Sequence, residues 1–350
     1  MTIPRQQRRF AEYLSHENVT ITIVAGDSFG VPAPRTPKEV LIVRDAWYPN
    51  DPERAVARSK KPKLKFSDRI HFLSNTEEMH AARLRHGLNS HYVNIGCFID
   101  ETVFYPETQI PREYDAVMNA RFAMTYNGTE LKRHYLTSKI ERLALLDPIF
   151  WSNERGYRDK YARRSNCKFI NSERLPPKQV ADILRRSHVG LVLSRLEGVC
   201  RASSEYLLCG LPVVSTDSVG GRDVWYDDYN STIVPATEED VLSAVDKLKR
   251  EGRDPRRIRN DYLARAETFR KRFRDDVLGA ICAQYDVDWD LDQIMRMYPF
   301  RWWPHPSATE TDRWTLQSLK EIARDFLRHQ VIAPLERRWG TMSNPDGRPR

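Results

Sequence analysis

The sequence contains no long hydrophobic run and no paired-cysteine motif. No apolar stretch approaches the ~20 residues that a membrane-spanning helix needs, and the first ten residues lack the apolar core of a secretory signal. The five cysteines are scattered without a C-x-x-C pair, which argues against a zinc ribbon or a disulfide framework. We therefore expect a cytoplasmic protein, and peripheral contact with the inner face of a membrane stays open.

The bulk composition indicates a soluble globular chain with an affinity for anions. Its 350 residues suffice for one large domain or two medium ones, each able to bury a core. The formal net charge of +8 favours nucleotides, nucleic acid or an anionic membrane surface as partners, without choosing among them.

In the first third of the chain, β-rich runs alternate with helical ones, which predicts a parallel sheet. This rhythm gives strands at 19–25, 40–47, 70–73 and 92–98, with a helix at 76–85 capped by Asn75.

A proline-marked segment at 105–112 separates this rhythm from a second one. The second rhythm predicts strands at 115–122, 168–171, 189–194, 211–215 and 232–234, with helices at 130–146, 177–186 and 238–249. We expect an N-terminal domain at 1–109, a second α/β domain at 110–265 and a helical tail at 266–350. The tail would pack back on the domains through an apolar stripe between Leu316 and Leu335.

The most informative segment is S-R-L-E-G-V-C-R-A-S-S-E-Y-L-L-C-G-L-P-V-V-S-T, residues 194–216. A buried strand precedes it, a loop carries Glu197, a short helix carries Glu205, and another buried strand follows. Carboxylates accept hydrogen bonds from sugar hydroxyls, and backbone N–H groups at a helix start hold anions. The segment therefore predicts a ligand that is rich in hydroxyls and phosphate.

Together with G-G-R-D (220–223) and N-S-T-I-V-P (230–235), this segment resembles the donor domain of retaining glycosyltransferases of the GT-B fold, family 4, or glycosyl transferases group 1. The resemblance covers about residues 114–250 and, more weakly, 70–107. It implies an α/β fold in which two Rossmann-like parallel-sheet domains face each other across a cleft, the N-terminal one being reduced.

The resemblance also assigns roles to the two acids and their neighbours. It implies that Glu205 binds the ribose of a nucleotide sugar and that Glu197 contacts the donor sugar as the catalytic residue. The backbone amides of Gly198, Val199 and Cys200 would then lie close to the sugar and the diphosphate.

A leaving diphosphate needs cations, because negative charge builds up on it in the transition state. The resemblance places Arg121 and Lys132 in this role, with Arg133 as an alternative to Lys132. Gly220 and Gly221 form either a plain turn or a loop that closes over the donor.

We therefore expect transfer of a hexose from a nucleotide diphosphate sugar to an acceptor hydroxyl, with retention and without a metal or other cofactor. A UDP-sugar is favoured over a GDP-sugar. The acceptor would be a glycan or a lipid-linked molecule, in the synthesis of a polysaccharide, a glycolipid or a glycoconjugate. The alternatives are a non-catalytic nucleotide-sugar-binding protein, a sugar-nucleotide epimerase and a DNA-modifying glucosyltransferase, although nucleic acid is disfavoured as a partner.

Overall fold

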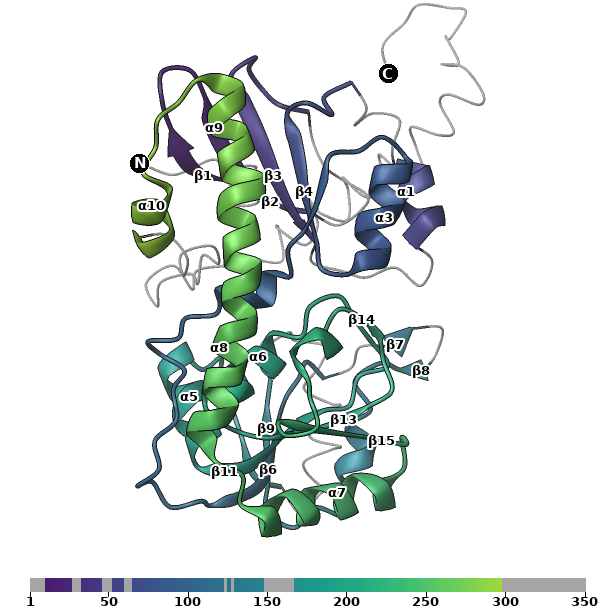
Figure 1. The fold of residues 1–350 in the computed structure, drawn as a ribbon. Helices are drawn as coiled ribbons and strands as arrows, with labels where there is room; N and C mark the ends of the chain where they lie inside the picture. The colour runs from purple at the N-terminus through teal and green to yellow at the C-terminus, as the bar shows by residue number, and fades with distance from the viewer. Residues whose placement is uncertain are drawn as a thin grey trace, which may run out of the picture. The chain divides into compact units, whose positions relative to one another are not determined.

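The computed structural model describes residues 10–26, 33–45, 52–59, 65–122, 125–126, 129–147 and 167–297. These residues form two main sheets, one of five strands and one of six, with helices packed against them (Figure 1). The apolar stripe expected between Leu316 and Leu335 lies outside the described residues. None of the described helices is long and apolar enough to cross a membrane.

The first sheet has the order β1-β2-β3-β4-β5 and is parallel except for β1, which pairs antiparallel with β2. Its strands are β1 (Phe10–Ser15), β2 (Thr20–Gly26), β3 (Glu39–Asp45), β4 (Ile70–Ser74) and β5 (Ser90–Tyr92), and its helices are α1 (Pro52–Ser59) and α3 (Glu77–Arg85). The strands expected at 19–25 and 70–73 and the helix at 76–85 are confirmed to within one residue. The strand expected at 40–47 is confirmed as far as Asp45, and positions 46–47 lie outside the described residues.

Two details of the first unit differ from expectation. The hydroxyl of Thr76, and not the side chain of Asn75, caps α3 by accepting the N–H of Met79. The strand expected at 92–98 ends at Tyr92, and the 3-10 helix η2 (Ile95–Phe98) follows it. Asn94 explains the break, because its side chain accepts the N–H of Gly96 and so bends the chain away from the sheet.

The second sheet is parallel throughout, with the order β10-β9-β6-β11-β13-β15. Its strands are β6 (Tyr114–Asn119), β9 (Leu143–Leu146), β10 (Cys167–Ile170), β11 (Ser187–Val192), β13 (Val213–Thr216) and β15 (Ser231–Val234). The helices of this unit are α5 (Pro177–Arg185), α6 (Arg201–Leu208) and α7 (Glu238–Glu251), and the strand pairs β7 (Thr125–Tyr126) with β8 (Thr129–Glu130) and β12 (Leu196–Glu197) with β14 (Val219–Gly220) complete it. The central strands are apolar runs, as expected where helices cover both faces of a sheet.

The helix predicted at 130–146 is wrong. After β8 the chain passes Arg133, whose φ of 53° is left-handed, and then forms the short 3-10 helix η3 (His134–Thr137) and strand β9. The run L-A-L-L of β9 is buried on both faces between β10 and β6. A short run of only apolar residues lacks the polar–apolar alternation that marks a half-buried strand. Because Leu and Ala also favour helices, the sequence pattern predicted a helix where the structure has a strand.

A long helical segment follows the second sheet. It contains α8 (Pro255–Arg272), the π-helical turn η6 (Phe273–Leu278) and α9 (Gly279–Tyr285), with α10 (Leu291–Met297) after them. Asp254 caps α8 by accepting the N–H of Arg256, and Pro255 occupies the first turn. α8 runs through position 265, where we place the end of the second domain, and that boundary stays a prediction.

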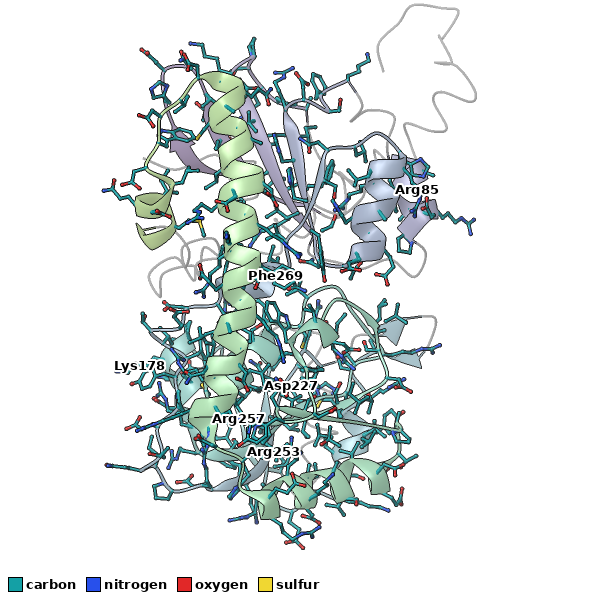
Figure 2. All side chains as sticks on the ribbon, in the orientation of Figure 1. Arg85, Lys178, Asp227, Arg253, Arg257 and Phe269 are labelled. Carbon is teal, nitrogen blue, oxygen red and sulfur yellow. The ribbon has the colours of Figure 1, made fainter. Side chains whose placement is uncertain are left out.

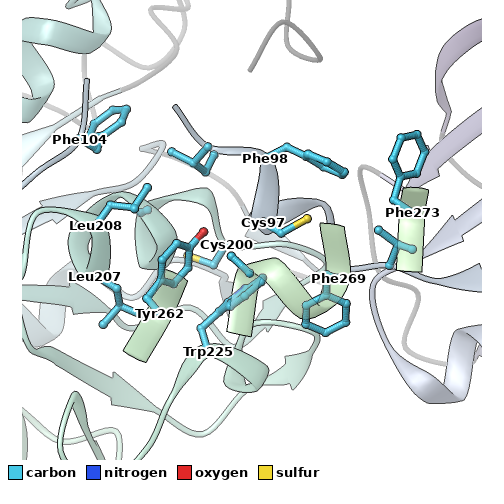
Figure 3. Close-up of a cluster of buried hydrophobic side chains, with 14 of the residues drawn as sticks. Cys97, Phe98, Phe104, Cys200, Leu207, Leu208, Trp225, Tyr262, Phe269 and Phe273 are labelled. Carbon is cyan, nitrogen blue, oxygen red and sulfur yellow. The ribbon is translucent and has the colours of Figure 1, made fainter. Parts of the chain in front are cut away.

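Side chains of α8 pack against both units. The Phe269 ring, labelled in Figure 2, lies 5.3 Å from that of Tyr92 and 5.4 Å from that of Trp225 between centroids. The close-up in Figure 3 shows Cys97 and Phe98 in the same buried cluster as Trp225 and Phe269. One core cluster thus contains side chains from the loop after β5, from α6 and from α8.

Candidate functional site

The loop that carries Glu197 is held by backbone pairing. Glu197 ends β12, which pairs in parallel with β14, so that Glu197 lies opposite Gly220. Gly220 has a φ of 130°, and a Cβ at this position would overlap the carbonyl oxygen of Glu197. Only glycine allows the two strands to approach this closely, so the first glycine of the pair fixes the backbone position of Glu197.

The carboxylate of Glu197 forms an ion pair with the ammonium group of Lys132. Both side chains are largely shielded, with 13% and 14% of their surface exposed. The segment that carries Lys132 is held in place because the N–H of Arg195 donates to the carbonyl of Leu131 at 2.9 Å. The structure therefore brings together the acid expected at the donor sugar and a cation expected at the diphosphate.

Glu205 lies in the second turn of α6 and is only 7% exposed. Its carboxylate accepts the side-chain N–H of Asn119 at 2.9 Å and lies 3.8 Å from the guanidinium of Arg201. Burial raises the pKa of Glu205, and the nearby Arg201 and Asn119 offset only part of that rise. Asn119 ends β6, and its own N–H donates to the hydroxyl of Tyr206 at 2.6 Å, which ties the strand end to α6.

The residues between the two acids form the entry to α6. Gly198 and Cys200 are buried and Val199 is half-buried, while Cys200 stands at the N-cap without a side-chain cap bond. The positive end of the α6 dipole therefore points to the loop that carries Glu197. Cys200 packs in the core, and its burial, together with the Glu197 carboxylate, raises the pKa of its thiol.

The two candidate cations after Glu130 face different partners. Lys132 meets Glu197, whereas Arg133 donates to the hydroxyl of Thr216 at 3.1 Å. Arg133 therefore braces the end of β13, and Lys132 is the better candidate for a phosphate contact. Arg121 lies half-buried in the loop after β6, two residues beyond Asn119.

Gly221 meets the first unit of the chain. Its carbonyl accepts the side-chain N–H of Asn94 at 2.8 Å, and a Cβ on Gly221 would lie 2.5 Å from the carbonyl oxygen of Asn75. The Gly220–Gly221 turn thus touches Glu197 on one side and the loops after β4 and β5 on the other.

A cavity of about 350 Å³ lies at the carboxyl end of the edge strand β10. Asn171, Glu173 and Leu175 line it together with Gln179 of α5. Parallel sheets bind ligands at the carboxyl ends of their strands, and β6 and β11 end at the same edge.

Sequence reasoning missed three residues of this region, namely Asn119, Arg201 and Arg222. Asn119 had a usable signal, because it is polar and ends a buried parallel strand. Arg201 lies four positions before Glu205 on one helix face, a spacing typical of an ion pair. Apart from its place in G-G-R-D, nothing in the sequence indicates that Arg222 belongs to this region.

Part of the chain matches a known protein family. Residues 153–263, which include both glutamates and both glycines, match the family model described as Glycosyl transferases group 1. The comparison with curated proteins finds no match.

Among solved structures, the chain is similar to the apo structure of OtsA, with 14% sequence identity and a TM-score of 0.51 over 69% of this chain and 68% of that one. Anabaena Alr3699/HepE in complex with UDP is 12% identical, with a TM-score of 0.49 over 71% of each chain. Sucrose-phosphate synthase from Thermosynechococcus elongatus is 16% identical, with a TM-score of 0.46 over 74% of this chain and 68% of that one.

The fold is of GT-B type, with two Rossmann-like α/β units built on parallel sheets. The family match supports sugar transfer as the class of reaction.

Proposed function

We propose that this protein transfers a hexose from a nucleotide diphosphate sugar, in particular a UDP-sugar, to an acceptor hydroxyl with retention of configuration. The observation that carries the proposal is the group of charges at one edge of the second sheet. There the Lys132–Glu197 ion pair lies beside the start of α6, and the buried Glu205 is held by Asn119 and Arg201. The match of residues 153–263 to glycosyl transferases group 1 supports the proposal.

In this proposal the bond between the anomeric carbon and the diphosphate oxygen breaks, and its electron pair remains on the diphosphate. The acceptor oxygen bonds to the anomeric carbon on the same face, and its proton passes to the diphosphate oxygen that leaves. Lys132 and Arg121 stabilise the charge that builds up on the diphosphate, together with the positive end of α6. Glu197 contacts the hydroxyls of the donor sugar and holds its ring for transfer.

Glu205 binds the ribose in this proposal. A carboxylate can accept one hydrogen bond from each of two vicinal hydroxyls, and this contact needs no proton transfer. Since Asn119 and Arg201 already hold Glu205 in place, little side-chain entropy is lost on binding. The cavity at the carboxyl end of β10 offers space for the nucleotide base.

No metal ion takes part in the proposed step, because Lys132 and Arg121 supply the positive charge at the diphosphate. We place the reaction in the cytoplasm, with a glycan or a lipid-linked molecule as acceptor. A non-catalytic nucleotide-sugar-binding protein is the second candidate. Slow hydrolysis of the donor separates the two, because an active site leaks some transfer to water and an inactive one does not.

Titration calorimetry with UDP, GDP, ADP and dTDP tests the proposal. The wild-type protein should bind one of these diphosphates, and Glu205→Ala should weaken that binding by roughly 10- to 100-fold, the cost of losing charge-assisted hydrogen bonds. Asp115→Ala is the matched control. Asp115 is also shielded and ion-paired, with Arg142 and Lys249, but it lies at the opposite end of β6.

The control variant should bind the diphosphate with wild-type affinity. Equal affinities for the diphosphate in wild type and Glu205→Ala would show that Glu205 does not bind the ribose. A wild-type protein that binds none of the four diphosphates would refute the proposed function.

A further inference from the structure

Arg222 is a fully buried arginine, and it has none of the roles expected at the donor site. It follows the Gly220–Gly221 turn, and 0% of its surface is exposed. A guanidinium cannot lose its charge at neutral pH, so its burial costs several kcal/mol unless every N–H group finds an acceptor. The position of an arginine here must therefore be explained by the groups that it binds.

The guanidinium of Arg222 joins the carboxyl ends of two central strands. One terminal nitrogen donates to the carbonyl of Ser194 at 2.9 Å, and the other donates to the carbonyl of Thr216. The Nε group points to the carboxylate of Asp223 at 3.3 Å. Ser194 follows β11 and Thr216 ends β13, so one planar group fixes the separation of two adjacent strand ends.

These two carbonyls mark the places where the chain leaves the sheet for the candidate site. Glu197 lies three residues after Ser194, and Gly220 lies four residues after Thr216. The two segments that follow these carbonyls then pair with each other as β12 and β14, so that Glu197 lies opposite Gly220. Arg222 therefore holds the base of a two-stranded projection whose tip carries the Glu197 carboxylate.

The projection has contacts on both sides. The N–H of Val219 donates to the carbonyl of Arg195, and Arg195 in turn holds the Leu131 carbonyl next to Lys132. On the other side, the carbonyl of Gly221 accepts the side-chain N–H of Asn94 from the first unit. A change at Arg222 would move Glu197 against Lys132, but it would leave Glu205, which Asn119 and Arg201 hold from β6 and α6.

We propose that Arg222 is the positioning residue of Glu197, which fixes the carboxylate against the donor sugar without touching the substrate. The inference rests on the proposed function. It predicts a split between turnover and affinity, because the projection carries Glu197 whereas the ribose contact comes from elsewhere.

The test uses the full chain with UDP and UDP-glucose as probes. Arg222→Lys keeps the charge but cannot bridge the two carbonyls in one plane. The kcat for UDP-glucose hydrolysis should fall by roughly 10- to 100-fold, as expected for a reacting group displaced by about 1 Å. The Kd for UDP should stay within about twofold of the wild-type value, since Glu205 is unchanged.

Arg185→Lys is the matched control for a merely structural role. Arg185 is also buried, with 4% of its side chain exposed, and it donates to the carbonyls of Val103 and Tyr105 far along the chain from Glu197. This variant should lose a comparable amount of thermal stability without a change in kcat. Equal losses of kcat in the two variants would show that Arg222 acts through stability alone.

Asp223→Asn keeps the inference open to refutation if Arg222→Lys does not fold. The side chain of Asp223 is 45% exposed, so the folded protein should tolerate the amide. We expect a smaller decrease in kcat, of a few fold, with the Kd for UDP unchanged. An unchanged kcat in Asp223→Asn, or weaker UDP binding with an unchanged kcat in Arg222→Lys, would overturn the inference. A wild-type chain that neither binds UDP nor hydrolyses UDP-glucose would instead overturn the proposed function, and the inference with it.

Discussion

Glu197 and Glu205 are eight positions apart in one segment, yet their surroundings differ in burial and in hydrogen-bond partners. Glu197 lies on a two-residue strand in a loop, and its carboxylate meets the ammonium group of Lys132. Glu205 lies on α6, is almost fully buried and is bound by a neutral amide at 2.9 Å and a guanidinium at 3.8 Å. Burial raises the pKa of Glu205, whereas a full ion pair compensates the charge of Glu197.

The difference shows how one short segment can serve two parts of one ligand. An ion pair can exchange its anion, so Lys132 can pass from Glu197 to an incoming diphosphate while the carboxylate turns to sugar hydroxyls. Glu205 is more deeply buried and is held by both Asn119 and Arg201, so it suits a fixed partner such as ribose. Under the proposed function, the diphosphate of the donor would therefore compete with Glu197 for Lys132.

Replacing Glu197 should have the largest effect, and in two opposite directions. In Glu197→Gln, hydrolysis of UDP-glucose should fall by at least about 100-fold, because the sugar contact is lost. The same change should tighten UDP binding by a few fold, since Lys132 no longer has a competing carboxylate. Kinetics and calorimetry on one preparation measure both. Glu205→Gln, the matched change on the other acid, should weaken UDP binding, and weaker binding in Glu197→Gln would remove the difference between the two sites.

Replacing Lys132 should have the next largest effect. Lys132→Met should lower the affinity for UDP by about tenfold, the typical cost of one charge-assisted hydrogen bond to phosphate. Arg133→Met is the control, because Arg133 contacts Thr216 and Asp217. Calorimetry should show near-wild-type affinity for this control. The opposite ranking of the two variants would make Arg133 the phosphate ligand.

The sequence was sufficient to predict the parts of this region that depend on local pattern. Buried parallel strands such as β6, β11 and β13 show continuous apolar runs, and the Gly-Gly pair predicts a turn or a loop, although only the structure shows that it has no room for a Cβ. Lys132 was placed at the site by resemblance, although the helix expected around it is absent.

The rest depends on contacts between segments far apart in the chain. The bond of Asn119 to Glu205 spans 86 positions, and that of Asn94 to Gly221 spans 127. No local pattern shows that β9 lies between β6 and β10, or that the guanidinium of Arg222 turns inward to two carbonyls. Such features are set by tertiary packing, which propensity and periodicity do not contain.

The smallest expected effect is a difference in the pH dependence of stability. The folded state raises the pKa of Glu205 through burial, so the folded protein holds this proton more tightly than the unfolded chain does. Its contribution to stability is complete below the ordinary value of 4.5 and is lost as the pH rises through the folded pKa. Glu205→Gln cannot ionise. It should therefore melt a few degrees higher than wild type at pH 7, and the difference should vanish near pH 4.

Asp115 supplies the opposite sign on the same sheet. Its burial alone would raise its pKa, but the hydrogen bonds of Arg142 and Lys249 bring the pKa below the ordinary 3.8. Its contribution is therefore present above pH 3.8 and is lost as the pH falls through the folded pKa. Asp115→Asn should melt lower than wild type at pH 7. Thermal melts of both variants between pH 4 and 8, each against wild type, measure the contrast. If Glu205→Gln also melts lower than wild type at pH 7, the buried carboxylate is as well compensated as Asp115, and the physical distinction between the two glutamates fails.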